Sequence, residues 1–357
     1  MEQFYKEHIK LSYSSYNEIQ DKKTFEKTSL VSIIMPVYNG SSFISNTIES
    51  ILNQTYKNFE LLILDDFSSD NSIEIIKCFR DKRIKLYTNK KNIGYVKGLN
   101  FLINKAKGEF IARNDQDDIS LPDRLDKQIN HFKRNPKLSI VGGQIKTFGE
   151  YRKKVSYPVN SSDCKSLLLF NTCLHHPTVI FKRKKIEKFI TKLYDENRAP
   201  SEDYDLWTRL SLSLYIENVP DIILKYRIHK NNYSTLHQER QFKNNLMIRE
   251  NYFKNYLKMP IKKKENILIN KIIYSQNLTK ENFFELALFF NNILSYSKNH
   301  AEYFSIKQLI SFYWLKSIIS YKSIDLRLLR LFLRNLRLIS ITIFFNPFYL
   351  KKILYRI

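Results

Sequence analysis

Four short apolar runs in the first third of the chain constrain its fold more than any other feature of the sequence. They include many β-branched residues, and segments with a helical spacing of apolar side chains separate them. This pattern predicts buried parallel strands joined by helices. The runs cover residues 31–37, 59–64, 84–87 and 109–112. Their regular alternation with helical segments predicts an α/β fold in which helices cover both faces of a sheet.

Polar residues follow three of these runs, at the points where the strands are predicted to end. They are Tyr38 and Asn39, then Asp65 and Asp66, then the acidic residues of segment 115–118. In open sheets of this kind, ligands bind beyond the carboxyl ends of the strands. Three polar ends at one edge of a sheet therefore indicate a ligand site.

The last of these segments brings three carboxylates close together, those of Asp115, Asp117 and Asp118. Crowding ionised carboxylates at the end of a buried strand is unfavourable unless a cation neutralises them. Mn²⁺ or Mg²⁺ would suit this spacing, because such ions take one or two carboxylates together with phosphate oxygens. The alternative for this segment alone is a solvated acidic turn that precedes a helix beginning near Pro122. The other two polar strand ends favour the ligand site.

The net charge of +24 over 357 residues indicates an anionic partner: nucleic acid, an acidic membrane surface or a phosphorylated substrate. Nucleic acid is disfavoured, because the basic residues are widely spread, no known binding module is found, and the acidic clusters would repel a phosphate backbone. Three cysteines without metal-binding spacing favour a reducing compartment. Without a signal peptide or an apolar run of spanning length, we expect a cytoplasmic protein.

The composition changes along the chain. We expect an N-terminal extension at 1–28, an α/β domain at 29–240, and a helical region at 241–357 that contains no glycine. Near the end, segment 326–357 has four arginines spaced three or four residues apart, at 327, 330, 334 and 337. This spacing predicts a basic amphipathic helix that lies on an anionic membrane surface. The alternative is an ordinary surface helix packed on the domain.

The polar motifs and their order resemble those of glycosyltransferase family 2, a group of inverting enzymes with the GT-A fold. The resemblance covers about residues 30–235, and the matching segments are 36–40, 65–70, 92–94, 115–118 with 122–124, 176–179, 202–207 and 226–229. It implies a Rossmann-like mixed sheet with a nucleotide-binding half at about 29–125 and an acceptor half at about 126–240. The helical C-terminal region would follow this domain.

The resemblance also implies a reaction. A hexosyl or N-acetylhexosaminyl group would move from a nucleotide sugar, expected to be a UDP-sugar, to a hydroxyl of a glycan or lipid-linked acceptor. Such acceptors belong to cell-surface polysaccharides, as in capsule or lipopolysaccharide synthesis, and they would place the protein at the inner face of the cytoplasmic membrane. A nucleotidyltransferase is the alternative enzyme. That class would carry a glycine-rich phosphate loop with Lys or Arg after the first strand, which segment 36–40 does not provide.

By resemblance, Asp203 is the general base that deprotonates the acceptor hydroxyl. Tyr38 and Asp66 would hold the nucleotide base, Asp117 would contact the ribose, and Asp118 would bind the Mn²⁺ or Mg²⁺ ion. Further expected contacts to the nucleotide sugar are Pro36, Asn92, Gly94, Lys97, Arg113 and Asp115, although Lys97 and Arg113 have solvated surface positions as an alternative. Asp117 and His229 are further expected metal ligands, with a structural histidine as the alternative for His229. Glu202, His176 and Trp207 are expected on the acceptor side.

Overall fold

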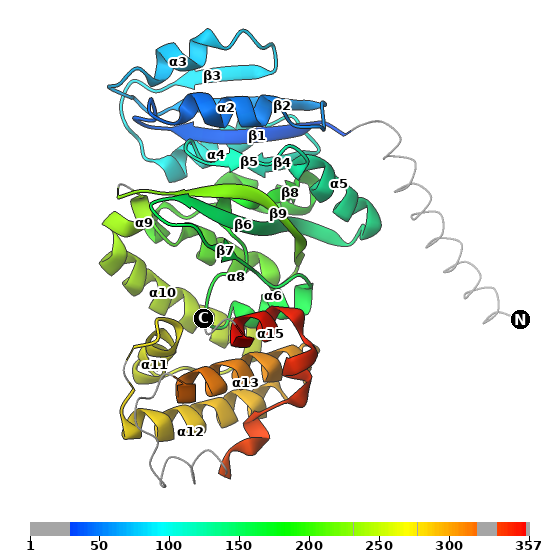
Figure 1. Ribbon diagram of the computed structural model, residues 1–357, viewed down its shortest axis with the longest axis vertical. Helices are drawn as coiled ribbons and strands as arrows, with labels where there is room; N and C mark the ends of the chain where they lie inside the picture. Colours follow the sequence, from blue (N-terminus) through cyan, green and yellow to red (C-terminus); the bar gives the residue numbers. More distant parts are fainter. Residues whose placement is uncertain (1–28, 231, 277, 320–333, 355–357) are drawn as a thin grey trace, which may run out of the picture.

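The computed structural model describes residues 29–230, 232–276, 278–319 and 334–354. A sheet with helices on both faces forms one part, and a helical region lies below it in Figure 1, coloured yellow to red. The expected N-terminal extension at 1–28 lies outside the described residues.

The described residues form a nine-stranded mixed sheet with the strand order β3-β2-β1-β4-β8-β6-β9-β5, and β7 pairs with β6. The first four positions in this order are parallel neighbours, and β8 then runs antiparallel to both β4 and β6. The strands are β1 (Val31–Val37), β2 (Phe59–Asp65), β3 (Ile84–Thr88), β4 (Phe110–Arg113), β5 (Ile119–Ser120), β6 (Leu138–Gly149), β7 (Lys154–Val155), β8 (Ile180–Lys182) and β9 (Tyr215–Ile228).

Helices cover both faces of the sheet, and the side chains of β1 alternate between them. Ile33 packs with the apolar faces of α2 and α5, whereas its neighbour Ile34 packs with α4 on the other face. A strand covered on both faces is buried along its length, which explains the unbroken apolar run at 31–37. The helices of this part are α2 (Ile44–Leu52), α3 (Ser72–Cys78), α4 (Tyr95–Lys105), α5 (Arg124–Arg134), α6 (Ser161–Leu167), α7 (Arg183–Ile186), α8 (Glu202–Ser211) and α9 (Tyr233–Leu236). The expected α/β class is confirmed.

The helical region shares its apolar core with one face of the sheet. Phe170, which follows α6, packs against Tyr313 at 4.8 Å and Phe290 at 6.1 Å between ring centroids. Each buried aromatic side chain of this kind stabilises the fold by about 1.5–3 kcal/mol. The region contains α10 (Gln238–Tyr252), α11 (Lys263–Ile273), α12 (Lys280–Ser297), α13 (Tyr303–Ile319) and α15 (Pro347–Leu354). The core therefore continues across residue 240, and the division into domains stays a prediction.

The expected helix over 326–357 is wrong for the part that the structure describes. Two short 3₁₀ turns, Leu336–Leu338 and Ile341–Phe345, precede α15. The side chain of Asn346 donates to Asp163 in α6 and to Gln308 in α13, both at 2.8 Å, and Pro347 starts a new helix. Arg327 and Arg330 lie outside the described residues. In the described part of the chain, no helix has the length and apolar character needed to cross a membrane.

Candidate active site

The carboxyl ends of β1, β2 and β4 place the expected polar residues beside one another. β1 lies between β2 and β4, and the register sets Val37 opposite Asp65. One residue further along, the amide of Asp66 donates to the carbonyl of Val37 at 2.8 Å. Tyr38, Asp66 and the acidic segment 115–118 therefore leave the sheet at the same edge, as their positions after three strands predicted.

Gln116, in the middle of the acidic segment, ties that segment to the end of β1. Its side-chain oxygen accepts from the amide of Tyr38 at 2.8 Å, and its side-chain nitrogen donates to the carbonyl of Tyr38 at 3.1 Å. A Cβ atom on Gly40 would lie 2.8 Å from the same oxygen, so glycine leaves the room for this contact. The sequence carries no signal for this role of Gln116, because the role depends on the pairing of two loops that are distant in the chain.

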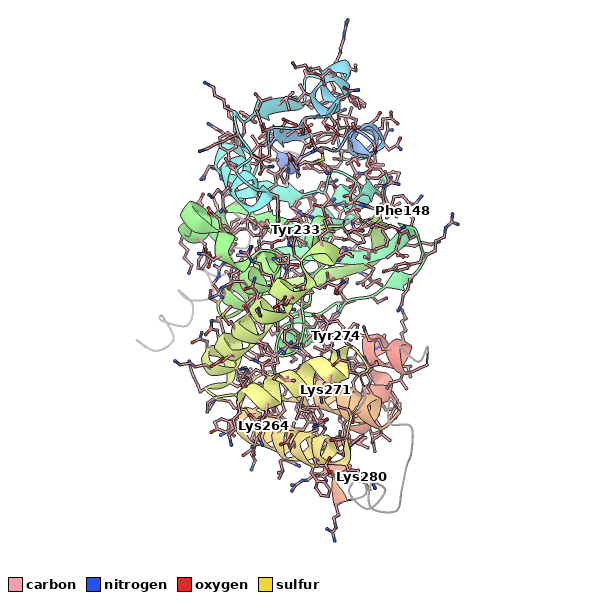
Figure 2. All side chains as sticks on the ribbon, turned by 90° about the vertical axis from the view of Figure 1, so that its left-hand side faces the viewer. Phe148, Tyr233, Lys264, Lys271, Tyr274 and Lys280 are labelled. Carbon is pink, nitrogen blue, oxygen red and sulfur yellow. The ribbon has the colours of Figure 1, made fainter. Side chains whose placement is uncertain are left out.

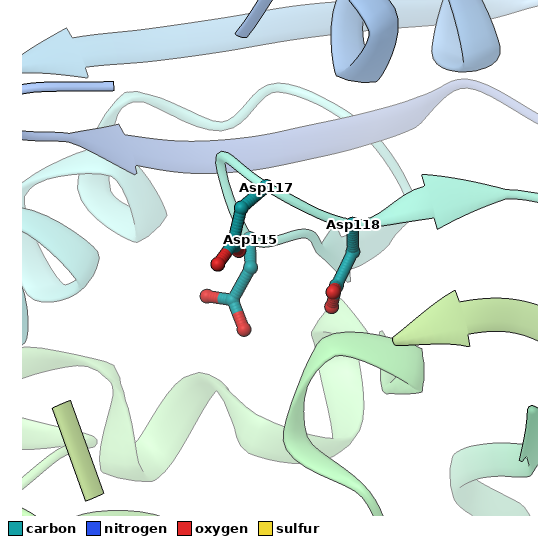
Figure 3. A group of neighbouring side chains, drawn as sticks. All are labelled: Asp115, Asp117 and Asp118. Atoms are coloured by element: carbon teal, nitrogen blue, oxygen red, sulfur yellow. The ribbon is translucent and has the colours of Figure 1, made fainter. Parts of the chain in front are cut away.

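Three carboxylates project from one loop in the same direction, those of Asp115, Asp117 and Asp118 (Figure 3). One oxygen from each lies within 4.8 Å of the others. Burial and its two acidic neighbours raise the pKa of Asp118 well above the usual range. Its Oδ1 accepts from the amide of Arg227 at 2.9 Å, whereas its Oδ2 has no hydrogen-bond partner among the described residues. A buried acceptor without a donor, beside two further carboxylates, fits a hard divalent cation.

A buried pair of arginines lies behind this loop. Arg113, 5% exposed, ends β4 and forms an ion pair with Asp115 at 2.5 Å, while its Nε and Nη1 have no partner in the described part of the chain. Arg124 donates to the carbonyl of Arg113 at 2.7 Å and to the side chain of Asn114 at 2.8 Å. Burial lowers the pKa of Arg124 to about 9. Arg124 thus shapes the turn, and Arg113 has donors left for an anion.

The end of β9 holds the acidic loop from the other side. The guanidinium of Arg227 lies 4.5 Å from the ring centre of Phe43 and 4.4 Å from that of Phe148. Its Nε donates to the carbonyl of Asp117 at 2.9 Å. His229 brings its Nε2 to 2.8 Å from a carboxylate oxygen of Asp117. This contact suits a structural histidine and a metal ligand equally, so the ligand role of His229 stays a prediction.

Asp66 organises the loop that precedes α4. Its carboxylate accepts from the side chain of Asn89 at 2.8 Å and from the amides of Ile93 at 2.9 Å and Gly94 at 2.8 Å. Asn92 supports the same turn, since its side-chain oxygen accepts from the amide of Gly94 at 3.0 Å. A carboxylate has about four acceptor positions. One position of Asp66 is therefore left for the N–H of a base, and that contact stays a prediction.

The two neighbouring acids at the start of α8, Glu202 and Asp203, differ in burial: Glu202 is buried and Asp203 is partly exposed. Glu202, 4% exposed, lies 2.5 Å from the hydroxyl of Tyr95 and 3.5 Å from Nδ1 of His176. Asp203 is half-buried and receives a hydrogen bond from the amide of Tyr204 at 2.7 Å. Partial removal from water and the neighbouring Glu202 charge raise the pKa of Asp203 to about 6. Asp203 is thus the member of the pair that a substrate can reach.

The remaining expected residues lie around these groups. Burial lowers the pKa of His176 to about 3, so its ring is neutral at pH 7, and its Nε2 lies 2.8 Å from the hydroxyl of Tyr194. Trp207 is fully buried against His176. Trp207 therefore packs behind His176, and its expected place on the acceptor side stays a prediction. The half-exposed ammonium of Lys97 lies 3.4 Å from Glu196, and its contact with phosphates stays a prediction.

Pro36 lies near the end of β1, beside α4. A Cβ atom on Gly98 would approach the Cβ of Pro36 to 3.3 Å, so the helix passes close to the strand at this point. His175, next to His176, brings its Nδ1 to 3.0 Å from the hydroxyl of Tyr157, while its Nε2 has no partner in the described part of the chain. The expected contacts of Pro36 with the nucleotide sugar stay a prediction.

Together these groups form one site with two kinds of carboxylate. The charges of Arg113 and Asp115 influence the pKa of buried Glu202, which brings the acidic loop and the start of α8 into one electrostatic environment. The acidic loop can hold a cation and, through it, phosphate oxygens, and Asp203 can accept a proton. This combination fits transfer of a group from a diphosphate to a hydroxyl.

The chain is similar to known proteins over most of its length. The model of the family described as glycosyl transferase family 2 matches residues 32–193. The O-antigen biosynthesis glycosyltransferase WbnJ of Escherichia coli is 37% identical over 212 residues, which are 56% of this chain and 80% of WbnJ. An uncharacterized glycosyltransferase of Haemophilus influenzae is 28% identical over 313 residues, 79% of this chain and 95% of that protein.

Solved structures show the same fold at low sequence identity. S. aureus TarS 1-349, crystallised with UDP-GlcNAc, has a TM-score of 0.55 at 16% identity and covers 81% of this chain and 88% of TarS 1-349. The mannosyltransferase PcManGT of Pyrobaculum calidifontis, in complex with GDP-Man and Mn²⁺, has a TM-score of 0.50 at 15% identity, with 86% of each chain covered. With the motifs, the sheet and these relatives together, the chain belongs to glycosyltransferase family 2.

Proposed function

We propose that this glycosyltransferase moves a sugar, with inversion, from a UDP-sugar to a hydroxyl of a glycan or lipid-linked acceptor in cell-surface polysaccharide synthesis. One observation carries the proposal: Asp203, a partly exposed carboxylate whose pKa is raised to about 6, shares its site with a cluster of three carboxylates, and one buried oxygen of this cluster has no partner among the described residues. The name of the E. coli relative, an O-antigen enzyme, supports the acceptor class. The UDP-GlcNAc bound to TarS supports the donor class.

In the proposed reaction, Asp203 accepts the proton of the acceptor hydroxyl as that oxygen attacks the anomeric carbon. The bond from the anomeric carbon to the phosphate oxygen breaks on the opposite face, so the configuration inverts and a nucleoside diphosphate leaves. Asp115, Asp117 and Asp118 would hold a divalent cation, with His229 as a further candidate. Such a cation, Mn²⁺ as in PcManGT or Mg²⁺, would neutralise the charge that develops on the leaving diphosphate. Arg113 would add the N–H groups of its Nε and Nη1, which have no partner among the described residues.

The proposal is tested with purified protein and a panel of UDP- and GDP-sugars, each with Mn²⁺ or with EDTA, by measuring release of the nucleoside diphosphate. We expect metal-dependent release from one UDP-sugar, through slow hydrolysis when the acceptor is absent. Asp203→Asn should lose this turnover and still bind UDP in calorimetry. Asp221→Asn is the matched control, because Asp221 is an exposed acid paired with Lys127 away from the acidic loop. Metal-independent UDP binding, or none, would contradict the proposal.

We also propose that the protein acts at the inner face of the cytoplasmic membrane. Residues 303–357 contain ten Lys and Arg and one Asp. Three large apolar side chains of this region are strongly exposed, Phe304 at 73%, Ile341 at 75% and Phe345 at 81%. Exposed apolar groups in a basic segment favour anionic lipid surfaces. The full chain should co-sediment with vesicles that contain phosphatidylglycerol but not with pure phosphatidylcholine vesicles, and Ile341→Ser with Phe345→Ser should weaken this binding.

A further inference from the structure

Tyr95 directly follows the loop before α4, which we call the nucleotide-side loop because Asp66 holds it. Tyr95 is also hydrogen-bonded to Glu202, the buried acid next to the expected base Asp203. Tyr95 is the first residue of α4 and comes directly after Gly94. The amide of Gly94 donates to Asp66, the acid expected to hold the nucleotide base, at 2.8 Å. Only one peptide bond therefore separates the residue held by Asp66 from Tyr95.

Tyr95 reaches across to the start of α8. Its hydroxyl lies 2.5 Å from Oε2 of Glu202, and the two residues are 107 positions apart in the chain. Burial and the charge of Glu202 raise the pKa of Tyr95 far above its usual range. The hydroxyl is therefore protonated at any physiological pH and donates its hydrogen bond to the carboxylate. A hydrogen bond to a charged acceptor is roughly twice as strong as one between neutral groups.

The ring of Tyr95 is fixed as well as its hydroxyl. It contacts the ring of Tyr233, in α9, edge to face at 4.9 Å between centroids. Tyr233 lies on the side of the molecule that faces the viewer in Figure 2, together with Phe148, whose ring packs on Arg227. Tyr95 thus joins three segments: the nucleotide-side loop, the start of α8, and the helix that follows β9.

Glu202 itself is poorly placed for chemistry. It is 4% exposed and already hydrogen-bonded, whereas its neighbour Asp203 is half-buried at the site. What Glu202 does control is the position of Asp203, because both residues lie in the first turn of α8. Any group that fixes Glu202 therefore fixes the direction from which Asp203 approaches a substrate hydroxyl.

We propose that Tyr95 is a positioning residue that couples the nucleotide-binding loop to the expected base through Glu202. The inference rests on the proposed function and adds a connection within it: Asp66, Gly94, Tyr95, Glu202 and Asp203 form a continuous chain of hydrogen bonds and peptide bonds. A nucleotide that binds Asp66 immobilises the loop and, through Tyr95, the first turn of α8. Donor binding would therefore restrict the orientation of the base.

The test is Tyr95→Phe, which keeps the ring and its contact with Tyr233 and removes the bond to Glu202. We expect kcat to fall about tenfold or more, the loss typical of a hydrogen bond to a charged group. The KM for the donor and the calorimetric affinity for UDP should stay within about twofold, because the hydroxyl of Tyr95 is bonded to Glu202 and not to a residue expected to hold the donor. Tyr56→Phe is the matched control: it removes a partly buried tyrosine hydroxyl that donates to the carbonyl of Ser29, before the start of β1 and at the opposite end of that strand from the site, and it should leave kcat unchanged.

Two further measurements separate positioning from mere packing. In hydrogen exchange, UDP with Mn²⁺ should slow the amides of 202–205 in the natural protein and fail to do so in Tyr95→Phe. In a double-mutant cycle, Tyr95→Phe should have little further effect on kcat once Glu202 is replaced in Glu202→Gln. An unchanged kcat in Tyr95→Phe, or a raised KM at constant kcat, would overturn the inference and leave the proposed function standing. Absence of turnover in the natural protein would instead remove the proposed function.

Discussion

Two buried arginines, one in the helical region and one beside the acidic loop, differ in how many of their guanidinium nitrogens are hydrogen-bonded. Arg249, in α10, uses both terminal nitrogens: they donate to the carbonyls of Asn266 and Phe170 and to two asparagine side chains. Arg113 uses one terminal nitrogen on Asp115, and its Nε and Nη1 have no partner among the described residues. Unpaired buried donors are costly. The fold thus leaves one nitrogen of Arg249, its Nε, and two nitrogens of Arg113 without a partner in the described part of the chain, and this difference favours Arg113 as a contact for a ligand.

The same contrast holds for carboxylates. Oδ2 of Asp163 in α6 accepts hydrogen bonds from both Asn160 and Asn346, whereas the buried Oδ2 of Asp118 has no partner among the described residues. Bonded polar groups stabilise the packing between helices and sheet, and at the acidic loop two charged side chains, Arg113 and Asp118, keep buried atoms without a partner among the described residues. Substitutions in the two regions should therefore affect different measurements.

The largest effect is expected at the acidic loop. Asp118→Asn removes a charge that burial and two neighbouring carboxylates already disfavour. We expect turnover to fall by at least about 100-fold, as for the loss of one preorganised electrostatic group. The free energy of unfolding without metal should stay equal or rise. A large loss of stability would mean that Asp118 is a structural acid, and the contrast would fail at this residue.

In the helical region we expect the opposite result. Arg249→Met should lower the free energy of unfolding by about 3 kcal/mol, because several buried acceptors lose their donors at once. The kcat of the protein that stays folded should not change. Chemical denaturation and turnover of the same preparation measure both quantities, and a selective loss of kcat would tie the helical region to the chemistry.

A smaller effect is expected on the pH dependence of kcat/KM, and it tests the proposed role of Asp203 as the general base. Its pKa is raised to about 6, so the carboxylate becomes protonated as the pH falls through 6. The value of kcat/KM should then fall about tenfold per pH unit below this point. The same raised pKa means that ionised Asp203 destabilises the folded state above pH 6, and that this penalty disappears as the pH falls toward 4. Asp203→Asn should therefore raise stability at pH 7.5 but not at pH 4.

The smallest expected effect concerns two residues with left-handed backbone angles. Phe67 follows Asp66 with φ of 68° and is 57% exposed, and Lys258 ends a helical turn with φ of 55°. Glycine at either position should raise the free energy of unfolding by up to about 1 kcal/mol. Only Phe67→Gly should also weaken UDP binding, by about fivefold, because its ring can stack on a nucleobase. If the two variants bind UDP with equal affinity, Phe67 is a surface residue without a role in nucleotide binding.

The sequence predicted those parts of the site that depend on local order along the chain. Tyr38, Asp66 and Asp115 each follow a strand, and parallel strands bring their ends together without further information. Gln116 and Arg227 were not recognised, because their roles arise from contacts between segments 78 and 110 residues apart. The arginine spacing near the end of the chain predicted one long helix, since periodicity carries no information about Asn346 and its partner in α6.

The contact between Asp163 and Asn346 can form only after nearly the whole chain has been synthesised. The ribosome makes the sheet first, yet Phe170 meets Tyr313 and Phe290 only after nearly 150 further residues have been added. Until then, the apolar face of the sheet part that packs against the helical region is exposed to water. A shortened chain that ends near residue 240 should therefore aggregate, although every residue proposed for the chemistry would be present.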